Sequence, residues 1–399
     1  MSNRKLLTAI LLVAGTSIGG GTVALPMVLA NLGVLPSAIL MVMVWGLTYY
    51  MSLLSVELNL QLDYGLSLGK LGERFSGRGA RLIGEISIKA LSYALLAAYL
   101  SGSASILQQL ISELGGPVIS LQMLEAVVAV WSFLVLLGPV SVVSVANNVA
   151  FLGFLSILAI LLVVFSFNMN VAALPWIVKP NLNGVGAALT VVFTSFGYQI
   201  IFHTLRNYLG ANPGYQRCAF LCGSIIPAIV YLLWTAGVLG VLNQKAPLFF
   251  VQLVDGQVRI GELIGQLASL TRWTLVKPLV WTMSTLAVVT SIFGVGLGLT
   301  DTAQDALKEV IPTKPVWRRM IAALTAMLPA YLVAILAPGA FLRILSVAGA
   351  ILVVIAIWLP AYLWWRAKFE KPKLLELKPL GVAIGVLVGL VMMIVGLLV

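Results

Sequence analysis

Two polar, glycine-marked segments interrupt apolar runs that are otherwise long enough to cross a membrane. Residues 15–22 hold four glycines before Pro26, and residues 194–199 hold Gly197 among polar and aromatic neighbours. Each glycine inside a helix costs about 1 kcal/mol relative to alanine, so the first segment favours local unwinding. Close helix packing would explain Gly15 and Gly19, but not three consecutive glycines before a proline. Two broken helices at corresponding places in two halves of a chain indicate a transporter site.

The chemistry predicted at these breaks is the binding of charged groups by the backbone. Free N–H groups at the start of a half-helix attract a carboxylate, and carbonyls freed near residues 14–17 or 193–196 accept an ammonium group. Nearby hydroxyl and aromatic side chains supplement these contacts or close over the ligand, although the aromatic ones also suit packing in the core or against lipid. The predicted substrate-binding residues are Thr16, Ser17, Gly19, Gly20, Gly21, Tyr93, Ser195, Phe196, Gly197, Tyr198 and Gln199.

Two further side chains are candidates for carrying a proton. Lys89 follows Glu85 by one helical turn, an order that favours a neutralising ion pair, whereas a buried lysine readily loses and regains its proton. His203 is the single histidine and lies one turn after Gln199 on the same face. It is either a proton relay or a hydrogen-bonded structural residue.

The composition excludes a soluble enzyme. Of 399 residues, 61% are hydrophobic and 9% are charged, whereas soluble domains carry about 25% charged residues. The net charge of +11 does not indicate nucleic-acid binding, because the basic residues lie at the ends of apolar runs, as in membrane proteins. Cys218 and Cys222 support neither a disulfide framework nor a zinc site, and no metal site is predicted.

Eleven apolar runs predict eleven transmembrane helices. With the N-terminus in the cytoplasm, seventeen Lys and Arg residues fall on the inner side and five on the outer side, four of these in the long segment 243–277. The positive-inside rule therefore predicts a cytoplasmic N-terminus and a C-terminus on the opposite side. Segment 243–277 is amphipathic enough to hold a short helix on the bundle. The predicted spans are 6–32, 35–61, 80–111, 121–138, 143–167, 185–209, 217–242, 278–305, 319–337, 340–365 and 379–399.

The two breaks fall in the first and sixth spans, five helices apart. This spacing predicts two halves, residues 1–167 and 185–365, with residues 379–399 as an additional helix. Because each half has an odd number of spans, the second half must have inverted topology.

The interrupted segments resemble motifs of a known family. Residues 15–21, with Leu25 and Pro26, resemble the first-helix signature of the hydroxy/aromatic amino acid permeases, a tyrosine/tryptophan-specific transporter family of the amino acid–polyamine–organocation superfamily. Residues 194–199, and residues 290–299 with Asp301, resemble its sixth- and eighth-helix motifs. The resemblance implies an all-α membrane protein with the five-plus-five inverted repeat of the bacterial leucine transporter, with helices 1 and 6 broken. The family commonly has histidine where this chain has Gln199, so a coupling role of that histidine does not transfer.

The resemblance also implies two choices of coupling ion. Members of the family are usually described as proton symporters. In related sodium-coupled transporters of this fold, residues spaced like Ala287, Thr290 and Ser291 supply a carbonyl and two hydroxyls, and the first helix adds two carbonyls, which here match Gly15 and Ile18. Five hard oxygens suit a small cation, but hydroxyls in membrane helices also bond to their own backbone.

The sequence therefore predicts a secondary active transporter that brings an aromatic amino acid into the cytoplasm through the plasma (inner) membrane. Tyrosine with a proton is the leading prediction. The alternatives are sodium-coupled uptake of tyrosine or tryptophan, and a serine or threonine permease. A channel is the alternative class, whereas an intramembrane enzyme lacks a catalytic constellation. The expected partners are the amino acid and membrane lipid, with no cofactor, nucleic acid or obligate protein partner.

Overall fold

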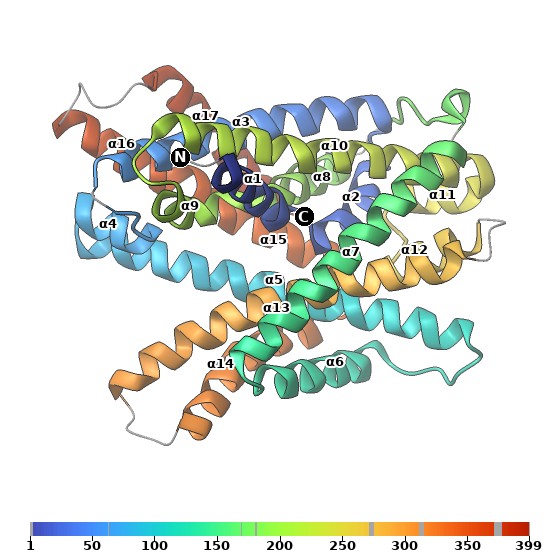
Figure 1. Ribbon diagram of the computed structural model, residues 1–399. Helices are drawn as coiled ribbons and strands as arrows, with labels where there is room; N and C mark the ends of the chain where they lie inside the picture. Colours follow the sequence, from blue (N-terminus) through green and yellow to red (C-terminus); the bar gives the residue numbers. More distant parts are fainter. Residues whose placement is uncertain are drawn as a thin grey trace.

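The structure, a computed structural model, is built from helices that cross one another in a single bundle (Figure 1). It describes residues 3–62, 64–168, 170–179, 182–270, 275–310, 315–370 and 377–398, and these ranges contain helices but no strand. The all-helical prediction is therefore confirmed. Four basic residues used to predict the orientation lie outside these ranges: Arg272, Lys314, Lys371 and Lys373.

The first half of the chain forms two half-helices followed by three long helices and two shorter ones. The helix α1 (Asn3–Ser17) meets α2 (Gly20–Leu29) at an angle of 54°. The next elements are α3 (Val34–Leu60), the short α4 (Leu68–Ser76), α5 (Arg78–Glu113), α6 (Leu121–Leu136) and α7 (Val140–Asn168), followed by the turn η1 (Val171–Ala173).

The second half begins with an interrupted helix: α8 (Leu182–Ser195), the 3₁₀ turn η2 (Gly197–Ile201) and α9 (Phe202–Leu209). The later elements are α10 (Pro213–Lys245), α11 (Pro247–Val254), α12 (Ile260–Ser269), α13 (Val276–Val310), α14 (Pro315–Leu336) and α15 (Phe341–Val353). The π-helical turn η3 (Val354–Trp358), α16 (Leu359–Glu370) and α17 (Pro379–Leu398) complete the chain.

Each of the eleven predicted spans coincides with an apolar helix or a chain of helices. Within the described ranges, nine helices are long and apolar enough to cross a membrane, and the bent pair α1–α2 makes a tenth. The helix α6 has 16 residues, or roughly 24 Å at 1.5 Å per residue, against about 30 Å for a bilayer core. The chain is therefore a multi-pass membrane protein, while the count of eleven crossings and the inverted repeat stay predictions.

The half-helix α2 lies at the centre of the bundle. All ten of its residues are buried, and it packs against α8, α10 and α13. A helix that is apolar on every face is stable only where neighbours cover it on all sides. This arrangement puts the first break beside the second and beside the middle of α10 and α13.

The segment 243–277 carries two short helices, which confirms the predicted helix on the bundle. The amphipathic α12 packs its apolar face against α5, α13 and α2, and α11 lies against α10 and α2. Figure 1 places both at the same end of the molecule as the junction of α5 and α6. They cover the end of the bundle that we predict to face outward.

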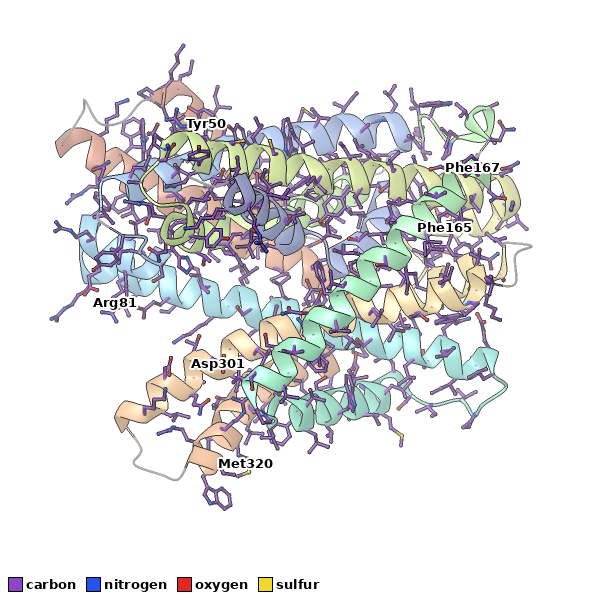
Figure 2. All side chains as sticks on the ribbon, in the orientation of Figure 1. Tyr50, Arg81, Phe165, Phe167, Asp301 and Met320 are labelled. Atoms are coloured by element: carbon purple, nitrogen blue, oxygen red, sulfur yellow. The ribbon has the colours of Figure 1, made fainter. Side chains whose placement is uncertain are left out.

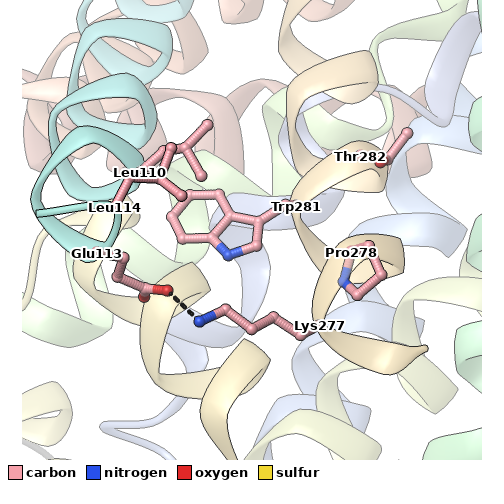
Figure 3. A pocket seen from close by; sticks show the side chains of 7 residues that line it. All are labelled: Leu110, Glu113, Leu114, Lys277, Pro278, Trp281 and Thr282. Carbon is pink, nitrogen blue, oxygen red and sulfur yellow. Dashed lines mark ion pairs between the residues drawn. The ribbon is translucent and has the colours of Figure 1, made fainter. Parts of the chain in front are cut away.

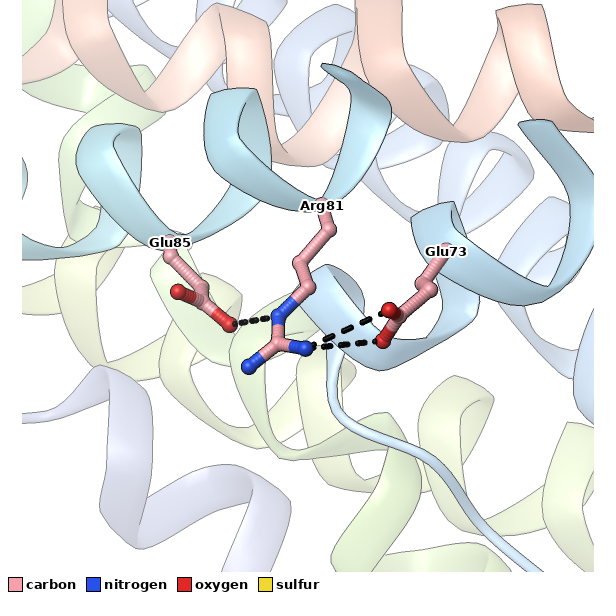
Figure 4. Close-up of polar contacts among 3 residues, drawn as sticks. All are labelled: Glu73, Arg81 and Glu85. Atoms are coloured by element: carbon pink, nitrogen blue, oxygen red, sulfur yellow. Dashed lines mark hydrogen bonds and ion pairs between the residues drawn. The ribbon is translucent and has the colours of Figure 1, made fainter. Parts of the chain in front are cut away.

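The predicted ion pair between Glu85 and Lys89 is wrong. The Glu85 carboxylate accepts a hydrogen bond of 2.7 Å from Arg81 Nε, and Arg81 Nη1 lies 3.0 Å from Glu73 on α4 (Figure 4). Because α4 packs along the start of α5, the arginine reaches two carboxylates at once. Lys89 is exposed, so it does not reach into the bundle.

Charged side chains gather at one end of the molecule. Figure 2 shows Arg81 and Asp301 toward this end and Phe167 toward the other. Asp301 lies 3.9 Å from Arg319, an ion pair between α13 and α14. This is the end that we predict to face the cytoplasm, because most basic residues of the sequence belong to it.

A buried carboxylate joins three parts of the bundle. Glu57, near the end of α3, is 4% exposed and accepts hydrogen bonds from Trp364 Nε1 on α16 at 2.8 Å and from the backbone N–H of Leu377 at 3.1 Å. Removing this acceptor would leave two donors without that partner.

We expect Glu57→Ala to lower the stability by about 1–3 kcal/mol, the usual cost of leaving a buried donor unsatisfied. The matched control is Glu73→Ala, which removes an exposed ion pair worth at most about 1 kcal/mol. Thermal unfolding of the purified variants in detergent, followed by tryptophan fluorescence, makes the comparison. Equal melting temperatures for the two variants would contradict the anchoring role of Glu57.

Candidate functional site

The first span is unwound at the predicted place. The helix α1 ends at Ser17, α2 begins at Gly20, and Gly19 between them is extended, with φ −167° and ψ −144°. The Ile18 N–H still bonds to the Ala14 carbonyl at 3.0 Å, and the Thr22 N–H bonds to the Gly19 carbonyl at 2.9 Å. The break is therefore confined to two residues and exposes the beginning of α2.

A hydroxyl from α13 caps this helix beginning. The backbone N–H of Gly20 donates to Ser291 Oγ at 3.0 Å, and Ser291 Oγ in turn donates to the Ala287 carbonyl at 2.8 Å. The structure thus brings a predicted substrate-binding segment against a predicted ion-binding residue. A helix N-terminus attracts anions, and here its present acceptor is a neutral side chain.

Glycine is required at the break because neighbours approach closely. A Cβ atom on Gly20 would lie 2.6 Å from Cε1 of Tyr99 on α5, and one on Gly21 would lie 2.8 Å from Ser195 Oγ. The Tyr99 hydroxyl also interacts with Ser291. The space around the start of α2 is therefore set by Tyr99 on one side and by the second break on the other.

The second break is milder than the first. The helix α8 ends at Ser195, Phe196 adopts φ −97° and ψ 32°, and the chain continues through the 3₁₀ turn η2 before α9 begins. This interruption lies where the sequence predicts it, but the direction of the span is kept. It frees the carbonyls at the end of α8.

Tyr231 on α10 connects the two breaks. Its hydroxyl lies 2.6 Å from the carbonyl oxygen of Ser17 and 2.9 Å from that of Ser195, and its ring packs edge-on against Phe196 with centroids 5.4 Å apart. A hydroxyl has one proton, so it donates to one of these carbonyls at a time. The sequence analysis missed Tyr231; its only signal is a tyrosine in the middle of an apolar span.

The chain resembles known permeases over almost its whole length. Residues 2–399 match the model of the tryptophan/tyrosine permease family. The chain belongs to this family. It is 31% identical to tyrosine-specific transport systems 2 and 1 of Haemophilus influenzae, covering 94% and 91% of this chain and 91% and 88% of theirs. It is 25% identical to glutamine transporter 2 of Aliivibrio fischeri, over 90% of this chain and 88% of the relative.

Family membership confirms the resemblance seen in the sequence and makes the protein a permease rather than an enzyme. Within this permease, two predicted site residues point toward α3. The Tyr198 hydroxyl donates to Thr48 Oγ1 at 3.3 Å, and Gln199 Nε2 donates to the Thr48 carbonyl at 3.5 Å. Both side chains are buried. Their substrate-binding role stays a prediction, while the described contacts hold both side chains of the second break against α3.

Of three other predicted residues, Tyr93 and Lys89 lie on α5 away from the breaks, and His203 follows the second break on α9. Tyr93 donates to the Thr325 carbonyl on α14 at 3.0 Å, and the tyrosine of α5 that contacts the first break is Tyr99. His203 is partly buried on α9, with Nε2 3.4 Å from Thr204 Oγ1. Lys89 is exposed on α5.

Most hydroxyls of the predicted sites bond to their own helices, the alternative considered from the sequence. Thr290 Oγ1 donates to the Leu286 carbonyl at 2.7 Å. Gly15, another residue of the predicted ion site, faces Phe151: a Cβ atom added to Gly15 would lie 3.4 Å from Phe151 Cε1. The same pattern of donation to the residue four positions earlier holds for Thr16, Ser17 and Ser195.

We expect Tyr231→Phe to loosen both breaks, because it removes the hydroxyl that bonds to the Ser17 and Ser195 carbonyls. A lost hydrogen bond of about 1 kcal/mol corresponds to roughly fivefold faster local opening. Hydrogen–deuterium exchange over residues 18–22 and 196–199 measures this effect. Tyr208→Phe, at an exposed tyrosine of α9, is the control; the same exchange rates in both variants would show that Tyr231 does not hold the breaks.

Proposed function

We propose that this permease is a secondary active transporter that brings tyrosine into the cytoplasm by alternating access, coupled to protons. The observation that carries the proposal is the meeting of two half-helix ends and one half-helix beginning. The carbonyls of Ser17 and Ser195 lie within hydrogen-bond distance of one hydroxyl, and the N–H of Gly20, in the residue that begins α2 just after Ser17 and the break, is capped by Ser291. These are the acceptors and donors that an amino acid zwitterion needs.

The charged groups of the substrate would replace the neutral hydroxyls that now bond to the breaks. Its carboxylate takes the place of Ser291 Oγ at the N–H of Gly20, where the helix dipole favours negative charge. Its ammonium group takes the place of the Tyr231 hydroxyl at the carbonyls of Ser17 and Ser195. Charge-assisted hydrogen bonds are roughly twice as strong as neutral ones, so the exchange is favourable without a fixed charge in the protein.

The side chain of the substrate is proposed to be aromatic. Phe196 and Tyr99 stand at the two breaks, and aromatic pairs gain about 0.5–1.5 kcal/mol beyond the area they bury. The two relatives at 31% identity are named as tyrosine-specific, which supports tyrosine. Tryptophan, serine and threonine remain the alternatives from the sequence, and the name of the third relative adds glutamine.

A buried carboxyl group favours the proton as the coupling ion. Glu125 on α6 is fully buried, with the Ser101 hydroxyl and the Gly339 backbone beside it. In the part of the chain that the structure describes, it has no ion pair with a basic side chain. Burying an unpaired charge is costly, so this group is proposed to stay neutral when covered and to release its proton when water reaches it.

The sodium alternative has less support from the described contacts. Of its five predicted residues, Thr290 and Ser291 already donate within α13, and the Ala287 carbonyl is the acceptor of the Ser291 hydroxyl. Either ion supplies enough energy, since one charge moving through 100 mV yields about 2.3 kcal/mol. We further propose the inner membrane as the location, with the N-terminus in the cytoplasm and the C-terminus on the opposite side.

Gly20→Leu is expected to abolish tyrosine uptake while leaving membrane insertion intact, because the added side chain would occupy the space between α2 and Tyr99. Gly46→Leu is the control, since a Cβ atom there meets no atom of the described residues within 4 Å. Initial uptake of radiolabelled tyrosine into proteoliposomes is measured, with unlabelled tryptophan, serine, threonine and glutamine as competitors. Normal uptake by Gly20→Leu would refute the site. Accumulation of serine, threonine or glutamine in place of tyrosine would show that the proposed substrate is wrong. Flux that does not saturate would indicate a channel.

Glu125→Gln is expected to lose uptake driven by a proton gradient but to keep exchange of external for internal tyrosine, because exchange needs no net proton movement. Glu73→Gln, at an exposed glutamate, should retain both activities. Proton and sodium gradients are imposed separately on the same proteoliposomes. Uptake that requires sodium and is unchanged in Glu125→Gln would overturn the proton proposal and direct attention to Ala287, Thr290 and Ser291.

A further inference from the structure

A cleft of about 310 Å³ opens at the end of the bundle covered by α12, away from the two breaks (Figure 3). It lies between the last turns of α5 and the first turns of α13. Its lining combines apolar residues with an ion pair and an indole. The lining residues are Leu110, Glu113, Leu114, Lys277, Pro278, Trp281 and Thr282.

Within the described ranges, the indole of Trp281 is a donor without an acceptor. Its side chain is buried, at 7% exposure, and its Nε1 atom has no hydrogen-bond partner among the residues that the structure describes. In Figure 3 the N–H edge of the ring faces the side chains of Glu113 and Lys277. A buried unsatisfied donor costs about 1–3 kcal/mol, so an acceptor placed between the indole and the ion pair would be stabilised.

The ion pair restricts the charge of such a ligand. Lys277 Nζ lies 2.8 Å from Glu113 Oε2, and the two side chains are 53% and 19% exposed. A ligand with a single charge could pair with one of them only by leaving the other unpaired, which is costly at the less exposed Glu113. A zwitterion avoids this cost, because its two charges can satisfy both partners when it enters between them.

The rest of the cleft suits an apolar side chain on that zwitterion. Leu110 and Leu114 stand on the α5 side, and the Trp281 ring lies beside them in Figure 3. The volume is at the small end of the range for ligand pockets, about 300–1,000 Å³. A single amino acid fits this size, whereas a larger peptide does not.

We propose that this cleft is a second binding site for an α-amino acid, separate from the site at the helix breaks. The carboxylate binds Lys277 Nζ and Trp281 Nε1, the ammonium group binds Glu113, and an aromatic side chain packs against Leu110 and Leu114. The choice of tyrosine as ligand rests on the proposed function. With the predicted orientation, the cleft opens to the outside and holds an amino acid before it enters the central site.

The test counts the tyrosine molecules bound per chain by the purified protein at saturating radiolabelled L-tyrosine. Wild type is expected to bind two. The double variant Glu113→Gln with Lys277→Gln removes both charges without leaving either alone, and Trp281→Phe removes only the indole N–H; each is expected to halve the bound tyrosine. The controls are Lys245→Met and Trp176→Phe, a lysine and an exposed tryptophan outside the cleft, which should keep the wild-type value.

Gly20→Leu separates this proposal from the proposed function. It should lose tyrosine uptake yet retain one bound tyrosine, which Trp281→Phe then removes. Wild-type protein that takes up tyrosine but binds one molecule, lost in Gly20→Leu, would overturn the second site alone. Absence of tyrosine uptake by the wild type would overturn the proposed function instead.

Binding is repeated in membranes with and without phosphatidylethanolamine, whose headgroup is also a zwitterion. Equal binding in both supports a free amino acid as the ligand. A second tyrosine that binds only when this lipid is omitted would identify a lipid headgroup as the occupant and overturn the proposal.

Discussion

Backbone that leaves a helix inside a bilayer must find hydrogen-bond partners within the protein, and the bundle is arranged around this requirement. The Gly20 N–H donates a hydrogen bond to the hydroxyl of Ser291 on α13. The carbonyls of Ser17 and Ser195 lie within hydrogen-bond distance of the Tyr231 hydroxyl on α10. These partners come from two different helices, so α10 and α13 must both lie against α2. The close approach of Tyr99 and Ser195 to glycines in α2 then completes the enclosure of the break.

In the proposed mechanism, the same requirement allows a substrate to replace the hydroxyl partners of the breaks. Ser291 and Tyr231 are neutral side chains. A charged group of a substrate could take their place as the hydrogen-bond partner of the breaks. If the breaks were satisfied by fixed charges, a zwitterion would have to displace an ion pair. If they were left unsatisfied, the closed state would lose about 1–3 kcal/mol for each buried group. Neutral hydroxyls therefore keep the protein stable without a substrate and still permit a substrate to bind.

The backbone features were predictable from the sequence, and the side-chain partners were not. Glycines and a proline mark the break at residues 18 and 19 because they change backbone energetics directly. Tyr231, Tyr99 and Glu125 depend instead on how each helix is rotated. In a membrane protein, lipid-facing and core-facing positions are both apolar, so hydrophobic periodicity does not reveal that rotation. The i, i+4 spacing likewise predicted a pair of Glu85 with Lys89, but Glu85 pairs with Arg81, which lies four residues earlier on the same helix.

Recognition through backbone groups also separates binding of an amino acid from selection of its side chain. In the proposed site, the N–H of Gly20 and the carbonyls of Ser17 and Ser195 would contact only the part that all amino acids share. A scaffold of this kind is compatible with relatives of 25–31% identity named for tyrosine and for glutamine. In this proposal, selectivity would depend on the side chains around the breaks, among them Tyr99 and Phe196. Changes at these two positions should alter which amino acid is accepted before they alter whether one is bound.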